Sequence, residues 1–139
     1  MAVTHVVMPS EVAEEIVKPK ETGKSESPRS ETRFINFRTA APIPALTGVI
    51  LRTVSPVKGE CTSLTLHFPA GCNSLVLIRV KIGDTWEPLA GWIALNDATP
   101  VYAVSYPVRK TSPLEVEIWN TDLQFAHHPS VILALQGEP

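Results

Sequence analysis

Short apolar runs separated by turn-forming residues fill the chain from residue 48 onward. Within the run 60–68, Leu64, Leu66 and Phe68 occupy alternate positions, and polar residues lie between them. Such alternation is typical of a strand with one buried face. The runs predict seven strands, at residues 48–54, 60–68, 74–82, 89–95, 100–108, 114–119 and 130–135.

Seven short strands with no amphipathic helix between them predict an all-β fold. We expect an antiparallel β-sandwich or jelly roll of about seven to eight strands, with an extended N-terminal arm. A parallel α/β fold is excluded because no connection is long enough to hold a crossover helix. The apolar positions of the alternating runs predict this core: Leu64, Leu66, Phe68, Val76, Ile78, Val80, Leu114, Val116, Ile118, Val131 and Leu133.

Residues 1–40 differ from the rest and predict an extended, polar arm, followed by a sandwich domain at 41–139. Ser10 stands where a helix cap would stand and favours a short helix at 10–18. Residues 18–33 carry no apolar side chain apart from prolines, so this spacer cannot bury enough surface to fold alone. Its apolar flanks predict partner contacts through Val6, Val7, Val12, Ile16, Val17, Phe34, Ile35 and Phe37.

Composition narrows the classes of partner. The 139 residues have a net charge of −2, with 44% hydrophobic and 19% charged residues, and show none of the basic patches that nucleic acid requires. No apolar run approaches the roughly 18 residues of a membrane helix. The first residues lack the charged and apolar regions of a signal peptide. We therefore expect folding in a cytoplasm, with neither nucleic acid nor a membrane as partner.

The densest cluster of reactive side chains lies between the last two predicted strands, at Asn120, Asp122, His127 and His128. Adjacent histidines in an extended segment point to opposite sides, and Pro129 keeps the segment extended. A zinc or copper site would need a further ligand from a distant part of the chain, and no ligand spacing predicts one. We interpret residues 120–129 as a loop whose histidines bind no transition metal.

Two pairs of turn residues, Asn96 with Asp97 and Asn120 with Asp122, leave a calcium site open as an alternative. Carboxylate and amide oxygens are calcium ligands, but two carboxylates are few for a calcium cage. Asn and Asp also occur in turns because their side chains bond to the local backbone. The sequence favours turn chemistry and predicts no metal and no cofactor.

No nucleophile, zinc-protease or phosphate-loop motif is present, so the sequence predicts no catalytic residue. Glu115 and Glu117 share a strand face beside Trp119, which fits a sugar-binding platform or a hydrolytic carboxylate pair. The alternative is that outward glutamates keep the strand soluble and block edge pairing.

The runs at 60–68 and 74–82 look like two strands joined by a turn at 69–71, and this hairpin would not place Cys61 and Cys72 opposite each other. Both cysteines are therefore expected to be buried, free thiols.

Trp86, Trp92 and Trp119 are the remaining candidates for a functional surface. Tryptophan is frequent in protein interfaces because its ring is large and amphipathic. The same properties suit carbohydrate sites, and the core or the ends of the sandwich are equally compatible positions. The sequence leaves these alternatives open.

The chain from about residue 60 to 135 resembles small β-sandwich accessory proteins that decorate or cement virus particles. The likeness consists of strand-and-turn patterns in three blocks: FPAGCNSLVLIRV (68–80), ALNDATPVY (94–102) and PLEVEIWNTD (113–122). The resemblance implies a compact jelly roll whose N-terminal arm laces neighbouring subunits together. It implies no catalytic residues.

Two functions follow as expectations. The first is a non-enzymatic structural protein of a larger assembly: a capsid decoration, cement or minor virion protein. It would be located in the virion after synthesis in a host cytoplasm, and would form homo-oligomers, bind a capsid protein, or both, through its arm. The second is a carbohydrate- or ligand-binding β-sandwich module, which the three tryptophans favour.

Overall fold

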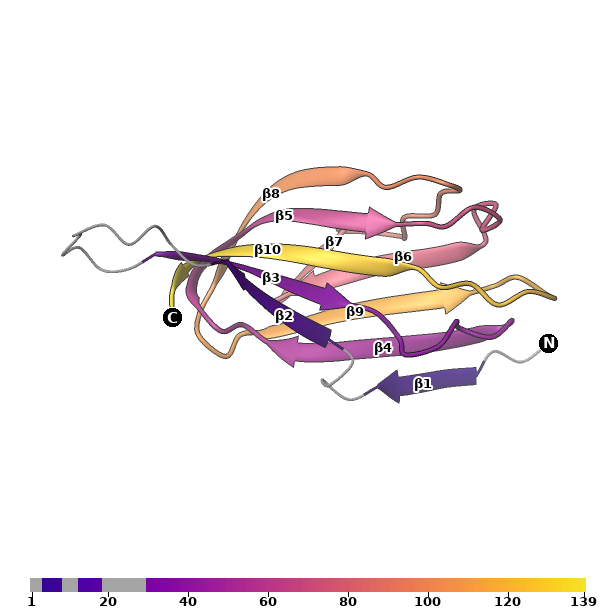
Figure 1. The fold of residues 1–139 in the computed structure, drawn as a ribbon, viewed down its shortest axis with the longest axis horizontal. Coiled ribbons are helices and arrows are strands. Elements are labelled where there is room, and N and C mark those ends of the chain that lie inside the picture. Colours follow the sequence, from indigo (N-terminus) through magenta and orange to yellow (C-terminus); the bar gives the residue numbers. More distant parts are fainter. Residues whose placement is uncertain (1–3, 9–12, 19–29) are drawn as a thin grey trace.

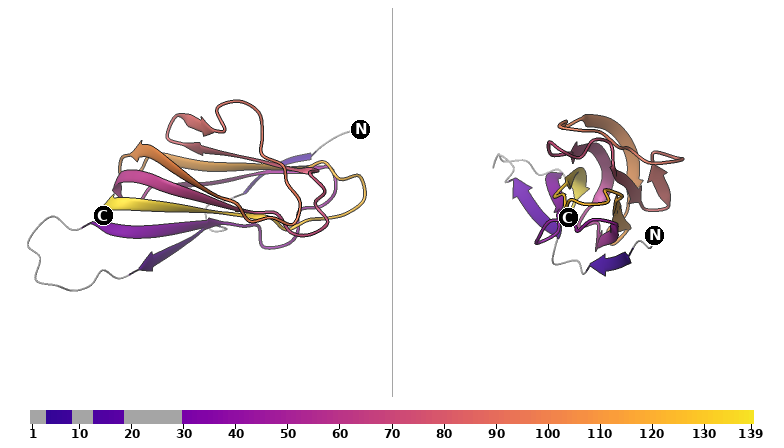
Figure 2. Two further views of the ribbon diagram at one scale, coloured as in Figure 1. Left: turned by 90° about the horizontal axis from the view of Figure 1, so that it is seen from above. Right: turned by 90° about the vertical axis from the view of Figure 1, so that its right-hand side faces the viewer.

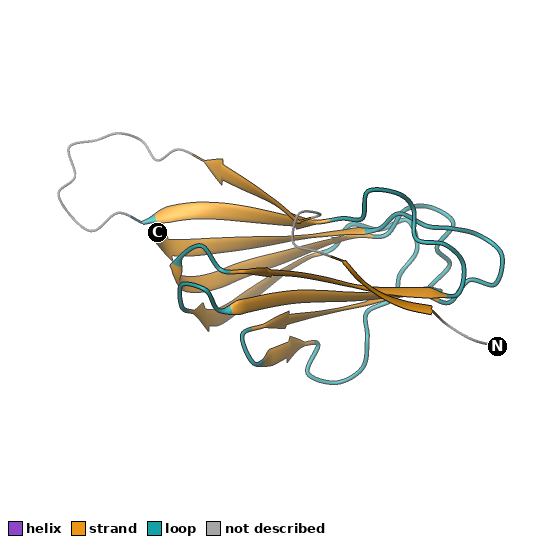
Figure 3. Cartoon of the chain, turned by 90° about the horizontal axis from the view of Figure 1, so that it is seen from below, coloured by secondary structure: helices purple, strands orange, loops and turns teal. Residues whose placement is uncertain are grey.

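The computed structural model describes residues 4–8, 13–18 and 30–139. These residues form ten strands and no helix (Figures 1 and 3). The strands are β1 (Thr4–Met8), β2 (Ala13–Lys18), β3 (Glu31–Phe37), β4 (Thr47–Val54), β5 (Lys58–His67), β6 (Val76–Ile82), β7 (Thr85–Glu87), β8 (Val101–Val108), β9 (Pro113–Asn120) and β10 (Ser130–Glu138). Among the described residues, no helix has the length and apolar character that a membrane crossing requires.

The strands form two five-stranded sheets that pack face to face (Figure 2). Sheet A has the order β1-β4-β9-β6-β7, and sheet B has the order β2-β3-β10-β5-β8. Within β3 to β10, each connection crosses from one sheet to the other, except the tight β6–β7 turn. This is the connectivity of an eight-stranded jelly roll. The predicted antiparallel sandwich is confirmed, and the strand order identifies it as a jelly roll.

β1 and β2 extend the two sheets at their edges. β1 runs parallel to β4, with Val6 opposite Val49. β2 is antiparallel to β3, with Ile16 opposite Phe34. The short helix expected at 10–18 is therefore wrong for residues 13–18, because pairing with an open sheet edge supplies backbone partners that two isolated helical turns lack. Residues 10–12 lie outside the described residues.

The predicted core is confirmed in full: every one of the expected core residues is completely buried between the sheets. Strand β6 shows why alternation predicts the core: its residues alternate between buried and half-buried along its whole length. The alternate side chains of β6 and β9 point inward against sheet B, and the others form the outer face of sheet A.

The residues proposed as anchors of the arm have different positions. Ile35 and Phe37 lie on β3 and belong to the core, so their side chains are packed within this chain. Phe34, on the opposite face of β3, is half-buried. Val6 and Val7 lie on β1, and Ile16 and Val17 lie on β2. Val12 lies outside the described residues.

The structure differs from the expected strand layout in two details. Residues 89–95 do not form a strand; only Ile93 pairs, as an isolated bridge to Ile78, and the short strand β7 precedes them. The expected hairpin between 60–68 and 74–82 is also absent, because β5 lies in sheet B and β6 in sheet A. In a jelly roll, strands that follow one another along the chain pass to opposite sheets.

Candidate functional site

Three tryptophans meet on the outer face of sheet A: Trp86 and Trp92 from one short segment, and Trp119 from a later strand. Trp119 lies on β9 opposite Leu77 of β6, and Trp86 lies on β7 opposite Lys81 of β6. Trp92 precedes Ile93, whose bridge to Ile78 holds it beside the same strand. All three tryptophans are half-buried. The jelly-roll order of sheet A therefore gathers side chains from three segments.

The centre of this face is an arginine held between two indoles. The guanidinium carbon of Arg79 lies 4.1 Å from the ring centre of Trp86 and 4.3 Å from that of Trp92. Its Nε and Nη2 lie 2.8 Å and 2.7 Å from Oε1 of Glu117, its register partner on β9. Two cation–π contacts and an ion pair fix the guanidinium group in one position.

Trp119 continues the same surface. Its ring meets that of Trp92 edge-on, with centres 6.4 Å apart and planes at 87°. It also lies over Gly48 of β4, which is directly opposite it in the register. We name the surface formed by Arg79, Trp86, Trp92, Glu117 and Trp119 the tryptophan–arginine face. Sequence analysis had selected the tryptophans, but not Arg79 or Gly48.

Two arginines around this face are paired with glutamates of β9. Arg52 of β4 lies 2.7 Å from Glu115 of β9, and Arg79 neutralises Glu117. Lys81 has its ammonium nitrogen 5.7 Å from the ring centre of Trp86. The outward glutamates therefore form cross-strand ion pairs. The face is a largely apolar surface with fixed polar groups and little net charge.

The loop after β9 is held by a polar network. Nδ2 of Asn120 donates to the carbonyl oxygens of Ile43, Pro44 and Phe125, at 3.0–3.1 Å. Oδ2 of Asp122 lies 2.8 Å from Nε2 of His127, and both side chains are buried. The backbone N–H of Gln124, followed by His127, lowers the pKa of Asp122. These groups fix the shape of the loop.

The neighbouring histidines are directed apart. Nε2 of His128 lies 2.7 Å from the carbonyl oxygen of Thr39, whereas His127 contacts Asp122. Oδ1 of Asn96 accepts hydrogen bonds from the backbone of Gly71 and Asn73. Asn96 is thus engaged in turn chemistry, as are Asn120 and Asp122. Within residues 30–139 and the two described N-terminal strands, no group of three or more His, Cys, Asp or Glu is placed to hold a metal ion.

The two cysteines are buried and are not bonded to each other, as expected. Burial raises the pKa of Cys61 to about 12. Burial also raises the pKa of Cys72, and the nearby charge of Asp122 adds to this effect. Both thiols are therefore protonated near neutral pH and unsuited to nucleophilic chemistry.

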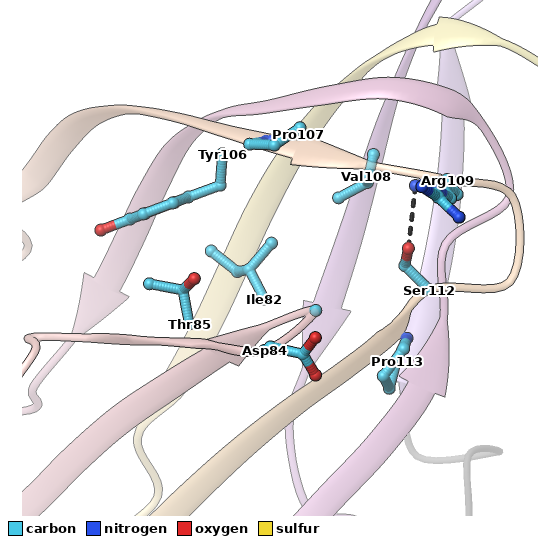
Figure 4. Close-up of a pocket in the computed structure, with 10 residues that line it drawn as sticks. Ile82, Asp84, Thr85, Tyr106, Pro107, Val108, Arg109, Ser112 and Pro113 are labelled. Atoms are coloured by element: carbon cyan, nitrogen blue, oxygen red, sulfur yellow. Dashed lines mark hydrogen bonds between the residues drawn. The ribbon is translucent and has the colours of Figure 1, made fainter.

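A cleft of about 530 Å³, which sequence analysis did not predict, opens between the sheets at the β7 and β8 edges (Figure 4). Ile82 and Val108, both buried, line its apolar part. Asp84, from the β6–β7 turn, and Arg109, from the turn after β8, line opposite sides. The Tyr106 hydroxyl donates to Oε1 of Glu87, and this bond raises the pKa of Tyr106 to about 12. The cleft lacks a cluster of reactive groups.

No family model and no curated protein matches the chain. A solved structure similar to it is that of PliG from Aeromonas hydrophila, a periplasmic lysozyme inhibitor of g-type lysozyme. The similarity covers 96% of this chain and 100% of that one, at 11% identity and a TM-score of 0.39. A likeness this distant assigns no function.

The expected biological role finds no support in these comparisons. The similar structure is that of a periplasmic inhibitor, and nothing found points to the predicted capsid decoration, cement or minor virion protein. The predicted virion localisation is unsupported as well, and neither prediction is retained. Self-association of the chain stays a prediction.

Proposed function

We propose that this chain is a non-catalytic β-sandwich module that binds an uncharged carbohydrate through the tryptophan–arginine face. The observation that carries the proposal is the placement of two half-buried tryptophans on one fixed guanidinium group, with a third tryptophan edge-on against one of them. These side chains come from β6, β7, β9 and the segment before Ile93. Rigid strands hold most of them, which favours a preformed binding surface.

The chemistry of the face matches that of a sugar ring. A sugar has apolar C–H surfaces, which stack on flat indole rings, and hydroxyl groups, which need hydrogen-bond partners. Tryptophan supplies large apolar area with a polar N–H edge. Nε and Nη2 of Arg79 are engaged with Glu117, whereas Nη1 lies outside that pair. Nη1 can therefore donate to a ligand hydroxyl from a fixed position.

The pairing of charges favours an uncharged ligand. Arg52 and Arg79 are each matched by a glutamate, and the ammonium group of Lys81 lies near the ring of Trp86. A site for acidic saccharides would be expected to hold an excess of cations, and its affinity would fall strongly as the salt concentration rises. We expect binding here to change little with ionic strength.

The test is affinity electrophoresis of the full chain in gels that contain β-glucan, xylan, galactomannan or soluble chitin oligomers. We expect at least one to retard the protein, and Trp92→Ala to weaken that binding at least about tenfold, equivalent to about 1.4 kcal/mol. Phe125→Ala is the matched control, because Phe125 is an exposed aromatic residue that does not belong to the tryptophan–arginine face.

Two results would refute the proposal. One is that none of these saccharides retards the protein, even at millimolar concentration. The other is that Trp92→Ala and Phe125→Ala bind the saccharide as well as the original chain does. The melting temperature of each variant separates lost binding from lost folding.

A further inference from the structure

The cleft at the β7 and β8 edges carries two oppositely charged side chains. These strands are the last ones of sheet A and sheet B, so the cleft opens where the sandwich ends. Asp84 and Arg109 line opposite sides of it and are the only charged residues in its lining (Figure 4). Within the described part of the chain, neither group forms an ion pair, with the other or with a third residue. The cleft therefore offers one positive and one negative group to a ligand.

The same cleft also has an apolar surface. Ile82 and Val108 are 2% and 4% exposed, and both contribute to the lining. Pro107 and Pro113 add further apolar area. The volume of about 530 Å³ lies within the range of small-molecule sites, roughly 300–1,000 Å³. Apolar walls with a few charged groups are the usual composition of such sites.

Backbone hydrogen bonds fix the turns that carry the two charges. Gly83 precedes Asp84 in the tight β6–β7 turn, and its N–H donates to the carbonyl oxygen of Pro113 at 2.9 Å. In the turn after β8, the N–H of Ser112 donates to the carbonyl oxygen of Arg109 at 2.9 Å. The N–H of Arg109 donates in return to Oγ of Ser112 at 2.8 Å. Because Pro113 directly follows Ser112, the Gly83–Pro113 bond joins the two turns to each other.

The turn after β8 is also anchored in the interior and is strained. The N–H of Thr111 donates to the carbonyl oxygen of Ser55, and the N–H of Ser55 donates to the carbonyl oxygen of Ser112, both at 2.8 Å. Ser55 is buried. Thr111 has a φ of 73°, which β-branched residues rarely adopt. Such strain persists only where the surrounding structure imposes it, and it concentrates at functional sites. The backbone that carries Arg109 is therefore set in place by the fold.

We propose that the cleft binds a short apolar peptide with an ionised terminus at each end. The ammonium group of the peptide pairs with Asp84. Its carboxylate pairs with Arg109, whose planar guanidinium group binds carboxylates through two parallel hydrogen bonds. The apolar side chains of the peptide contact Ile82 and Val108. Because both turns are already fixed, binding does not have to order them, and this improves affinity.

The pair of charges argues against simpler ligands. A wholly anionic or wholly cationic ligand leaves Asp84 or Arg109 facing a like charge, which disfavours binding. A free amino acid carries both charges on one carbon atom, so it cannot reach groups on opposite sides of a cleft. An uncharged saccharide uses neither charge. The cleft shares no residue with the tryptophan–arginine face, so the two sites are proposed on separate observations.

The test is titration of the isotope-labelled full chain with the tripeptide Ala-Leu-Ala, followed by NMR. We expect the backbone amide signals of Asp84, Arg109 and Thr111 to shift until they saturate. Acetylation of the N-terminus or amidation of the C-terminus removes one charge from the tripeptide. Each change should raise Kd at least about threefold, a modest factor because solvent screens exposed charges.

Asp84→Asn and Arg109→Gln remove the same charges from the protein and preserve the approximate size of each side chain. Each should raise the Kd of the free tripeptide at least about threefold. Asp97→Asn and Arg38→Gln are the matched controls, because both residues are exposed and neither lines the cleft. Trp92→Ala should also leave this Kd unchanged, so the peptide and saccharide proposals can fail separately.

The blocked peptides then assign each charge to its partner. Asp84→Asn should not weaken binding of the acetylated tripeptide further, since that ligand lacks the ammonium group that Asp84 binds. Arg109→Gln should still weaken it. The amidated tripeptide should show the reverse pattern. The dispersion of the amide signals shows that each variant is folded.

Three results would overturn the proposal. The first is that no amide signal shifts at millimolar tripeptide. The second is that the acetylated and amidated tripeptides bind as tightly as the free one, or that Asp84→Asn and Arg109→Gln leave Kd unchanged. The third is that only the amide and Arg109→Gln weaken binding, which would identify a site for the C-terminus of a longer chain instead.

Discussion

The ring of Trp119 lies directly over Gly48, on the neighbouring strand of sheet A. A Cβ atom at residue 48 would stand 2.7 Å from Cε3 and 2.8 Å from Cδ2 of the indole. Glycine at this position therefore leaves room for the ring to pack against the sheet. The ring in turn covers the backbone of residue 48, which has no side chain. The position of Trp119 in the proposed binding face therefore depends on the absence of a side chain at residue 48.

Gly48→Ala should therefore displace the Trp119 ring and destabilise the protein by roughly 1–3 kcal/mol, the usual cost of overpacking. In a Trp119→Ala background the clash is absent, and the same Gly48→Ala substitution should cost much less. Chemical denaturation of the two single variants and the double variant gives the coupling energy. Additive effects would show that the ring does not depend on Gly48.

A second prediction concerns acid stability and Asp122. Hydrogen bonds from Gln124 and then His127 lower the pKa of Asp122 in the folded state. A lowered folded pKa adds stability above the unfolded value, about 3.9 for Asp, and that stability is lost as the pH falls through the folded value. The melting temperature should therefore drop more steeply below pH 4 for the original chain than for Asp122→Asn. Parallel curves from pH 7 to pH 2 would contradict this.

The core provides a third prediction. Phe68 and Ile118 are completely buried between the sheets. Phe68→Ala and Ile118→Ala should each lower the free energy of unfolding by roughly 2–5 kcal/mol, because each leaves a cavity. Leu89, which is highly exposed, is the control, and Leu89→Ala should change that free energy by less than about 0.5 kcal/mol. Urea titration measures all three, and equal midpoints would disprove the assigned burial.

Alternation along single strands was enough to predict the sandwich and its core. A side chain such as Ile78 or Val116 is directed inward by the period of two alone, whatever the strand pairs with. Which strands pair with one another could not be predicted from this alternation. The turn at 69–71 suggested a hairpin, but β5 and β6 lie in different sheets, because jelly-roll partners are decided by packing across the whole domain.

The candidate site shows the same limit. Trp86, Trp92 and Trp119 could be selected by residue type, but their assembly into one face, with Trp86 and Trp92 on Arg79, depends on the order of β9, β6 and β7 in sheet A. The helix expected at 10–18 failed for a related reason. Local capping signals near Ser10 are weak, and the open edge of β3 overrides them in residues 13–18.

The last prediction concerns the ion pair at the centre of the tryptophan–arginine face. The Glu117 side chain is 10% exposed, whereas that of Arg79 is 31% exposed, so the carboxylate bears most of the desolvation cost. Arg79→Ala removes the guanidinium group from this buried carboxylate and from both indoles. It should lower the free energy of unfolding by roughly 1–3 kcal/mol, less than for a fully buried pair because solvent partly screens the arginine.

Arg79→Met combined with Glu117→Gln separates the charge from the packing. This double variant keeps a long side chain between the indoles and leaves no buried charge, so it should recover most of the stability lost in Arg79→Ala. Arg79→Lys should recover less, because an ammonium group cannot stack flat on two rings or bond side-on to a carboxylate. Urea titration of the three variants measures this order. If Arg79→Lys equalled the original chain, a simple positive charge would suffice, and the guanidinium geometry on which the proposed binding face depends would have no role.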